Sequence, residues 1–242
     1  MAGSVPAMGG DQDRIGVAEA ASTLGWWLEA GVDVAVAESP RNWLERKPEP
    51  PNVRPPSAEA VSQALETLDL FRDWLEKSPA LPLADIGSKR VLPHGAEGAP
   101  VMLIAEMPTG EDAAEGRPIA GEAWKLTERM LAAIGIDAAE AYSASLSCFH
   151  SPGTRMSPDE LAECASIARR HIALARPKRL LLLGDAPALA LLGKRLVQAR
   201  GHVHKIEGVR AVATFHPRFL LDRPSDKALA WRDLLLLMEE EA

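Results

Sequence analysis

Cysteine is scarce in this chain of 242 residues, which contains only Cys148 and Cys164. Two cysteines cannot by themselves supply a four-thiolate metal or iron–sulfur site. Two distant cysteines in a cytosolic chain are most often free thiols. We therefore expect both thiols to be free, and we expect no metal and no cofactor.

Long apolar runs are also missing, since none reaches the roughly 18 residues that span a bilayer. The first fourteen residues are small and polar, with Asp11 and Asp13, and show no basic flank followed by an apolar core. This pattern does not resemble a signal peptide. The hydrophobic fraction of 47% and the charged fraction of 25% are those of an ordinary globular protein. We expect a cytoplasmic protein with no membrane partner.

Charge is distributed unevenly along the chain. The total is −7, and residues 1–100 carry −6 of it. Between Lys194 and Arg232, however, nine basic residues face three acidic ones, a local net charge of +6. A basic segment within an acidic protein indicates a site for an anionic polymer.

Residues 1–56 are expected to form an N-terminal helix followed by a proline-rich linker. Val17–Ala30 has apolar residues at helical spacing and includes the pair Trp26-Trp27, which could contact a protein partner. The density of proline that follows is incompatible with regular structure; the prolines are Pro40, Pro48, Pro50, Pro51, Pro55 and Pro56.

The second expected domain, residues 57–242, begins with a helix that Ser57 can cap and that runs to about Lys77. From residue 100 onward, strand patterns alternate with helix patterns. The expected strands are 101–105, 141–146, 179–183 and 209–213, and the expected helices are 121–134, 157–175, 185–192 and 225–240. This alternation predicts an α/β three-layer sandwich around a four-stranded parallel sheet.

Ligands of such sheets bind at the carboxyl ends of the strands, which selects the loops 105–120, 146–157 and 214–224. Glu106 directly follows the first strand, and a carboxylate there could orient a water molecule or stabilise a cationic intermediate. The alternative is an acidic surface loop with turn residues.

The second loop combines hydroxyl groups, a turn and Arg155, which suits contacts to a phosphate or a base. Its alternative is a simple entry into the helix that Ser157 caps. Cys148 lies near His150, but this spacing alone is weak evidence for a nucleophilic cysteine.

The third loop begins Thr214-Phe215-His216-Pro217, immediately after the last strand. A histidine there can donate a hydrogen bond to an oxygen that gains negative charge in a transition state. A purely structural histidine at a strand end is the alternative. His202 and His204 have no close carboxylate or cysteine companions, and we interpret them as surface residues rather than metal ligands.

Taken together, these loops resemble the motifs of the uracil-DNA glycosylase superfamily, family 4 type, over roughly residues 60–238. The matching blocks occur in the family's order. They are Glu106-x-Pro108, Gly116-Arg117-Pro118, Gly121-x-Ala123, Pro152-Gly153-x-Arg155, Cys164, Pro177-Lys178, Gly184, Arg200-Gly201, Thr214-x-His216-Pro217, Leu220-Leu221, Pro224, Lys227, Trp231 and Asp233.

The resemblance implies an enzyme that flips a damaged base out of DNA and cleaves its N-glycosidic bond. His216 would stabilise the charge on the departing base, and Glu106 would lie near the sugar and the attacking water. Ile119, Ser145, Met107 and Pro108 would line the base pocket. The DNA-binding residues would be Arg155, Arg200, Arg218, Leu220, Leu221 and Arg223, with the two leucines wedged into the duplex.

The chain departs from the family at the positions that identify the base. Ile119 stands where the family has a stacking aromatic residue, and Ser145 stands where it has an asparagine that reads uracil. A serine cannot present the paired donor and acceptor of an amide. Phe149 follows Cys148 where the family has a cluster cysteine, so the resemblance implies a member without the iron–sulfur cluster, with apolar packing in its place.

Three interpretations of the chain remain open. The first is a DNA glycosylase with relaxed or altered base specificity. The second is a catalytically inactive protein of the same fold that acts as a DNA-binding or adaptor module, because a fold can outlive its activity. A third interpretation is an interaction protein that works through the acidic N-terminal segment.

Overall fold

The computed structural model describes residues 21–22, 25–26, 63–84, 89–151, 153 and 155–239. The chain divides into two compact units, Met1–Val53 and Arg54–Ala242. Of the helix expected over Val17–Ala30, the four described residues are helical. The expected proline-rich linker and the capping Ser57 lie outside the described residues.

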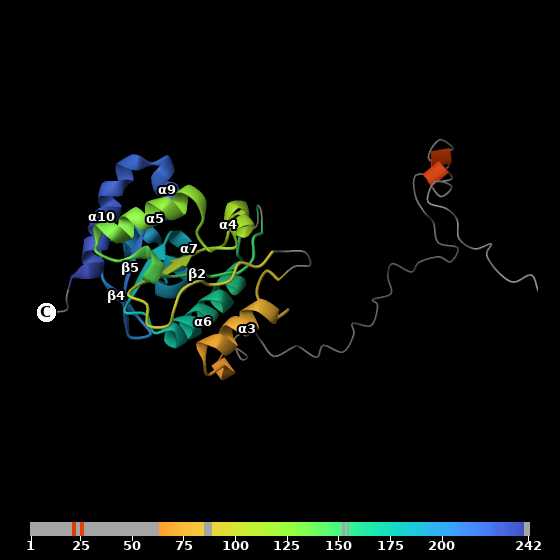
Figure 1. Cartoon of the computed structure of the whole chain (residues 1–242), viewed down its shortest axis with the longest axis horizontal. Coiled ribbons are helices and arrows are strands. Elements are labelled where there is room, and N and C mark those ends of the chain that lie inside the picture. The colour runs from red at the N-terminus through yellow and green to blue at the C-terminus, as the bar shows by residue number, and fades with distance from the viewer. Residues whose placement is uncertain are drawn as a thin grey trace, which may run out of the picture. The chain divides into compact units, whose positions relative to one another are not determined.

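The second unit is built around a central sheet with the strand order β2-β1-β3-β5-β4 (Figure 1). The strands β2 (Tyr142–Ser145), β1 (Met102–Ala105), β3 (Arg179–Leu183) and β5 (Val209–Thr214) are parallel to one another. These four strands confirm the parallel sheet expected from the sequence. The fifth strand, β4 (His204–Ile206), is antiparallel to β5 and was not predicted.

The sequence pattern does not predict β4, because a strand of only three residues is too short to show a periodicity. A tight turn joins it to β5, with Glu207 and Gly208 both at positive φ, 48° and 80°. Two successive residues in this region are typical of a two-residue hairpin turn. The turn pairs Ile206 with Val209 and extends the sheet beyond its last parallel strand.

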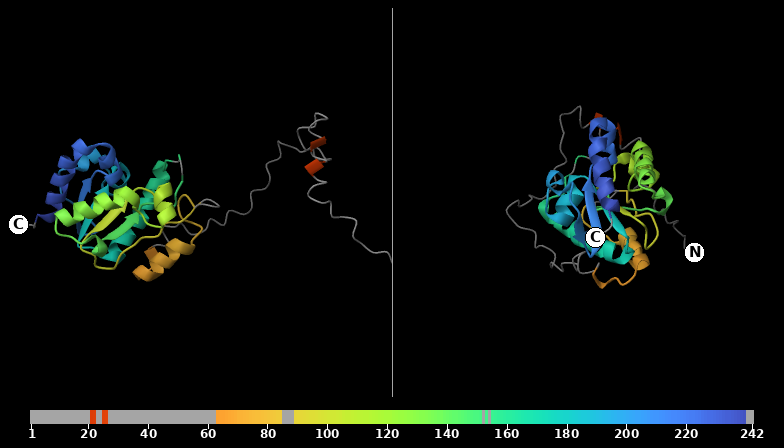
Figure 2. Two further views of the ribbon diagram at one scale, coloured as in Figure 1. Left: turned by 45° about the horizontal axis from the view of Figure 1, so that its top comes forward. Right: turned by 90° about the vertical axis from the view of Figure 1, so that its left-hand side faces the viewer.

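Helices cover both faces of the sheet (Figures 1 and 2). One face packs against α5 (Gly121–Ala133) and α10 (Lys227–Met238). The other packs against α3 (Leu68–Lys77), α6 (Pro158–Ala175) and α7 (Asp185–Leu192). Successive residues of β1 alternate between the two cores, as side chains of a strand must. The three-layer architecture is therefore confirmed.

The remaining described elements are short. They are α4 (Gly110–Glu115), α8 (Leu196–Ala199), α9 (Pro217–Asp222) and the 3₁₀ turns Ala138–Glu140 and Pro224–Asp226. The helices α4 and α9 lie in segments that the sequence indicated only as loops. No helix in the described part of the chain is long and apolar enough to cross a membrane.

The first helix on the α6 side of the sheet differs from the expected one. A single helix from Ser57 to Lys77 was predicted, but α3 begins at Leu68, because Thr67 accepts a hydrogen bond from the N–H of Leu70 and caps it. Phe71 and Leu75 of α3 are buried in the apolar core between the helices of this face and the sheet.

A polar network fixes α3 in place. Arg72 donates to the hydroxyl of Tyr142 at 3.3 Å, and that hydroxyl donates to Nε2 of His171 at 2.7 Å. Burial, reinforced by the Arg72 cation, lowers the pKa of His171 to about 3, which keeps the ring neutral and able to accept. The network links α3 to Tyr142 of β2 and to His171 of α6, and both of these side chains are buried.

Candidate functional site

Three of the residues singled out from the sequence lie at the carboxyl edge of the parallel sheet. Glu106 directly follows β1, and Ser145 is the last residue of β2, paired in register with Ala105. His216 lies two residues beyond β5, whose Thr214 is in register with Leu183 of β3. The site is therefore assembled from adjacent and nearly adjacent strands, as expected for this fold.

The protonation of His216 follows from its position as the N-cap of α9. Its Nδ1 atom accepts the backbone N–H of Arg218 at 3.1 Å. Burial, together with the Arg218 cation, lowers the pKa of His216 to about 4, against an opposing effect of Asp112. At neutral pH the ring is thus neutral, and the proton resides on Nε2. This nitrogen is a ready donor for an oxygen that becomes negative.

An ion pair fixes the helix that carries His216. Arg218 donates from Nη2 to Oδ1 of Asp112 at 2.5 Å, and Asp112 is completely buried. The other carboxylate oxygen of Asp112 accepts from the backbone and the hydroxyl of Thr109, which caps α4. Arg218 was expected to contact DNA, but its guanidinium instead joins the loop after β1 to the loop after β5. Asp112 was missed because its partner lies far away in the sequence.

Glu106 is exposed, but its surroundings affect its charge. Partial desolvation and the nearby carboxylate of Asp185 raise the pKa of Glu106, while Arg155 opposes the shift. Asp185 begins α7 after β3, so it adds a second acid at the same edge of the sheet. The sequence argument did not select Asp185, although it lies two residues beyond a predicted strand. Arg155 is exposed, and its charge is near enough to lower the pKa of Glu106.

The expected base-pocket residues have different surroundings. Ile119 is 1% exposed and packs in the apolar core on the α5 side, together with Ala105. Pro108 is buried and Met107 is half-buried. The hydroxyl oxygen of Ser145 is buried and has no hydrogen-bond partner among the described residues. An unsatisfied buried hydroxyl is costly, which is consistent with a group that pairs only when a ligand is present.

The loop after β2 is tied to the loop after β1 by His150. Its Nδ1 atom donates to the carbonyl oxygen of Pro108 at 2.9 Å. Its neighbour Cys148 is buried, and burial raises the pKa of that thiol to about 12. A thiol that stays protonated is a poor nucleophile, so the geometry gives no support to cysteine catalysis.

Arg200 is engaged inside the fold rather than free for phosphate. Its Nε and Nη2 atoms each lie 2.7 Å from Oδ2 of the buried Asp233. Thr214 also donates to that oxygen at 2.8 Å, and Gly201 donates from its backbone to Oδ1. The arrangement anchors the end of β5 to α10, a structural role that disfavours the expected DNA contact.

The expected wedge is a short helix, α9, and its two leucines differ. Leu220 is buried against α5 and α10, whereas Leu221 is 38% exposed. Only Leu221 has a side chain available to enter a duplex without rearrangement. Arg223 is exposed at the C-terminal end of the same helix, where its guanidinium lies 5.2 Å from the centre of the Phe219 ring.

Two stacked phenylalanine rings between two arginine side chains stiffen this surface. Arg200 lies 4.0 Å above the ring of Phe215, and Phe215 stacks on Phe219 with ring centres 4.9 Å apart. Arg223 continues the row. Such cation–π and stacking contacts hold the side chains of α9 in a defined arrangement next to His216.

The described residues do not fit an iron–sulfur cluster. Cys148 and Cys164 are the chain's two cysteines, and both are buried free thiols with pKa values raised to about 12 by burial. No group of three or more histidine, cysteine or acidic residues in the described ranges could hold a metal ion. Phe149 instead fills the core beside the two cysteines, under the guanidinium of Arg90 at 5.0 Å.

His202 and His204, expected to be surface residues, each donate to a backbone carbonyl. His202 is exposed and His204 is half-buried. Neither belongs to a metal-binding group in the described part of the chain.

Comparison with known proteins gives a consistent result. The model of the uracil DNA glycosylase superfamily matches residues 92–235. The type-4 uracil-DNA glycosylase of Archaeoglobus fulgidus is 27% identical over 141 residues, which cover 54% of this chain and 71% of that protein. Those of Pyrobaculum aerophilum and Saccharolobus solfataricus are 23% and 24% identical, over 70% and 72% of this chain and 92% and 87% of their own lengths.

The matched span contains all five strands of the sheet described above, together with Glu106, Ser145 and His216. It covers more than half of the chain, and the order of its motifs agrees with the resemblance noted in the sequence. The chain therefore belongs to the uracil-DNA glycosylase superfamily.

Proposed function

We propose that this protein is a DNA glycosylase that excises uracil or another deaminated base by hydrolysis of the N-glycosidic bond. The observation that carries the proposal is the neutral His216 ring, whose Nε2–H has no partner among the described residues and lies at the same sheet edge as Glu106 and Ser145. The type-4 names of the relatives support the same reaction class.

In the proposed reaction the bond between C1′ of the sugar and the base nitrogen breaks, and its electron pair leaves with the base. His216 donates from Nε2 to a carbonyl oxygen of that base and so stabilises the negative charge. The Glu106 carboxylate faces the cationic sugar and accepts a proton from the water that adds to C1′. Removal of one such donor costs about 10²–10³-fold in rate in comparable sites.

DNA is the proposed partner, and the exposed part of α9 is the proposed contact surface. Leu221 would fill the gap left by the flipped base, and the exposed Arg155 and Arg223 would contact phosphates. Arg200 and Arg218 are not included, because Asp233 and Asp112 engage their guanidinium groups.

The test is incubation of the purified protein with duplexes that contain uracil, hypoxanthine or xanthine, followed by detection of abasic sites. We expect abasic sites with at least one duplex, and a loss of about 100-fold or more for His216→Ala. No abasic sites from any duplex, with identical behaviour of His216→Ala, would rule out the enzymatic function.

A catalytically inactive DNA-binding module is the second candidate, favoured by Ile119 and Ser145. Ile119 has no π-face for a base, and Ser145 offers a single hydroxyl. The change Ser145→Asn separates the two functions. A glycosylase with weakened base recognition should excise uracil about tenfold faster with the amide restored, whereas an inactive module should remain inactive and bind DNA with unchanged affinity.

A further inference from the structure

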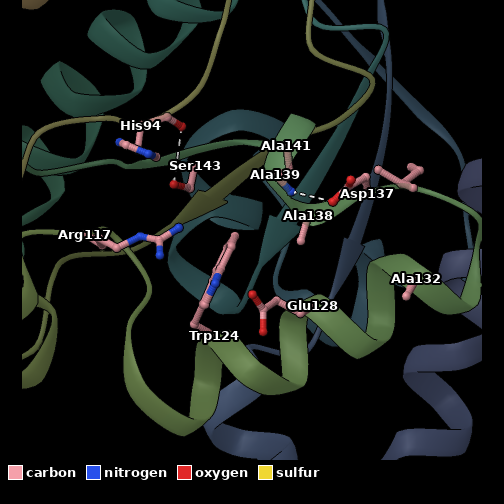
Figure 3. Close-up of a pocket in the computed structure, with 11 residues that line it drawn as sticks. His94, Arg117, Trp124, Glu128, Ala132, Asp137, Ala138, Ala139, Ala141 and Ser143 are labelled. Carbon is pink, nitrogen blue, oxygen red and sulfur yellow. Dashed lines mark hydrogen bonds between the residues drawn. The ribbon is translucent and has the colours of Figure 1, made fainter.

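A cavity of about 630 Å³ lies between α5 and the edge strand β2 (Figure 3). Its lining does not include Glu106, Ser145 or His216. The residues that matter to the argument are His94, Arg117, Trp124, Glu128, Asp137 and Ser143. Cavities of this volume typically hold small organic ligands.

Arg117 differs from the other half-buried arginines of the described residues in its lack of a hydrogen-bond partner. Its Nε atom is buried without a hydrogen-bond partner, and its guanidinium joins no ion pair among the described residues. Every other half-buried arginine in the described ranges donates to a carbonyl, a hydroxyl or a carboxylate. These are Arg72, Arg90, Arg169, Arg170, Arg179, Arg200, Arg210 and Arg218. The buried Nε atoms of Arg170 and Arg210 are also unpaired, but those side chains donate through Nη2, whereas Arg117 donates to no described residue. A buried polar nitrogen without a partner is costly, and an anionic ligand that pairs with the Arg117 side chain would remove that cost.

Trp124 holds this guanidinium in a fixed orientation. The Cζ atom of Arg117 lies 4.4 Å from the centre of the indole ring. The ring is half-buried and lines the cavity, so it also offers apolar surface to a planar group. An arginine stacked on an aromatic ring loses little further freedom when it forms a bidentate contact to phosphate.

The cavity has a positive end and a negative end. Figure 3 shows His94 and Arg117 on one side and Asp137 on the other, with Trp124 and Glu128 between them. Glu128 follows Trp124 by one helical turn on α5, so the two side chains share a face. A ligand that matches this arrangement carries an anion at the Arg117 end, a flat ring against Trp124 and a hydrogen-bond donor beside that ring, toward Glu128.

The cavity also adjoins the candidate site along two segments. Arg117 precedes Ile119 by two residues, and Ser143 precedes Ser145 by two residues on the same strand. Residues two apart on a strand point to the same face of the sheet. The cavity therefore lies next to the proposed base pocket on the α5 side.

We propose that this cavity binds a nucleotide, with its phosphate on Arg117, its base against Trp124 and an exocyclic amino group of the base donating to Glu128. The site is distinct from the catalytic residues and does not depend on the proposed reaction. Two sources carry this chemistry: a free nucleoside monophosphate and a nucleotide within a DNA strand.

The test is calorimetric titration of the full-length protein with dAMP, compared with deoxyadenosine and dTMP. We expect binding of dAMP, at least about tenfold weaker binding of deoxyadenosine because it lacks the phosphate, and weaker binding of dTMP because its base has no exocyclic amino group. Quenching of indole fluorescence by dAMP should disappear in Trp124→Phe.

Variants assign the contacts. Arg117→Gln should weaken dAMP at least about tenfold, and Glu128→Gln should abolish the preference for dAMP over dTMP. Arg129→Gln is the matched control, because this neighbouring cation on α5 lines a different cavity. The Arg117 side chain forms no hydrogen bond to a described residue and is held by its contact with Trp124, so the substitution should change the thermal transition only slightly.

A single-stranded oligonucleotide added to the dAMP complex identifies the source. Displacement of dAMP assigns the site to a nucleotide of the DNA strand, and simultaneous binding assigns it to a free nucleotide; both outcomes support the proposal. No binding of dAMP at millimolar concentration, or equal binding by wild type, Arg117→Gln and Trp124→Phe, would overturn it. Because the readout is binding, a failure of base excision would leave this result unaffected.

Discussion

At the scale of single residues, His216 has a structural and a proposed chemical role on its two ring nitrogens. Nδ1 accepts the backbone N–H that starts α9, which leaves the proton on Nε2 at the sheet edge. Protonation of Nδ1 would therefore break the helix cap as well as change the charge of the ring. The same hydrogen bond that orients the imidazole also keeps it neutral.

This coupling predicts a pH dependence of stability. The folded pKa of His216 is about 4, below its ordinary value of 6.5, so the unfolded chain binds the proton first as the pH falls. The stabilisation is complete above about pH 6.5 and is lost as the pH falls through 4, on the order of 2–3 kcal/mol. His216→Asn keeps a capping acceptor without this titration.

The measurement is the free energy of unfolding in urea between pH 7 and pH 4 for both proteins. His171 titrates in the same direction in each, so their difference isolates His216. Parallel curves for wild type and His216→Asn would contradict the assignment.

The sequence could locate the candidate catalytic residues but not the groups that hold them. Glu106 and His216 follow recognisable strands, so their place at one sheet edge was predictable. The ion pairs of Asp112 and Asp233 were not predictable, because their arginine partners lie 106 and 33 residues away in the sequence. Counting charges likewise could not distinguish the exposed Arg155 from Arg200 and Arg218, whose partners lie inside the fold.

At the scale of elements, α4 and α9 are joined by the Asp112–Arg218 pair. The Arg218 side chain is 28% exposed, but its partner is fully buried. Asp112→Asn removes the negative charge that pairs with the guanidinium and weakens the Thr109 cap, so we expect a loss of about 1.5–3 kcal/mol of stability. The double variant Asp112→Asn with Arg218→Met should recover part of that loss.

Denaturant unfolding of the two single variants and the double variant checks this prediction. A double variant as unstable as the sum of the two single changes would show that the pair is not coupled. A base-excision assay on Asp112→Asn then tests whether the pair also positions His216.

The helix α3 provides a second test at this scale. Phe71 is fully buried on α3, whereas Leu70 on the same helix is 52% exposed. We expect Phe71→Ala to cost about 3–5 kcal/mol and Leu70→Ala to stay within about 0.5 kcal/mol. Equal effects of the two changes on the thermal transition would show that α3 does not pack on the domain in solution.

At the scale of the whole molecule, an acidic protein would meet DNA through a small set of cations. For each phosphate contact that is removed, the slope of log affinity against log salt should fall by about 0.9. We expect that decrease for Arg155→Gln and for Arg223→Gln, since both residues are exposed. Arg200→Gln should lower stability and leave the slope unchanged, because Asp233 engages its guanidinium.

Fluorescence anisotropy of a labelled duplex between 50 and 200 mM salt measures these slopes. A slope that decreases for Arg200→Gln but not for Arg155→Gln would reverse the assignment of the two arginines.

The packing of α3 has one more consequence, for the limits of the domain. The family match begins at residue 92, but α3 and Arg90, which cover Tyr142 and Phe149, precede it. A fragment restricted to residues 92–235 would carry every residue proposed for catalysis and would still expose the apolar surface that α3 covers. The limits of the family match are therefore not the limits of the packed domain, because Phe71 and Leu75 of α3 belong to its apolar core.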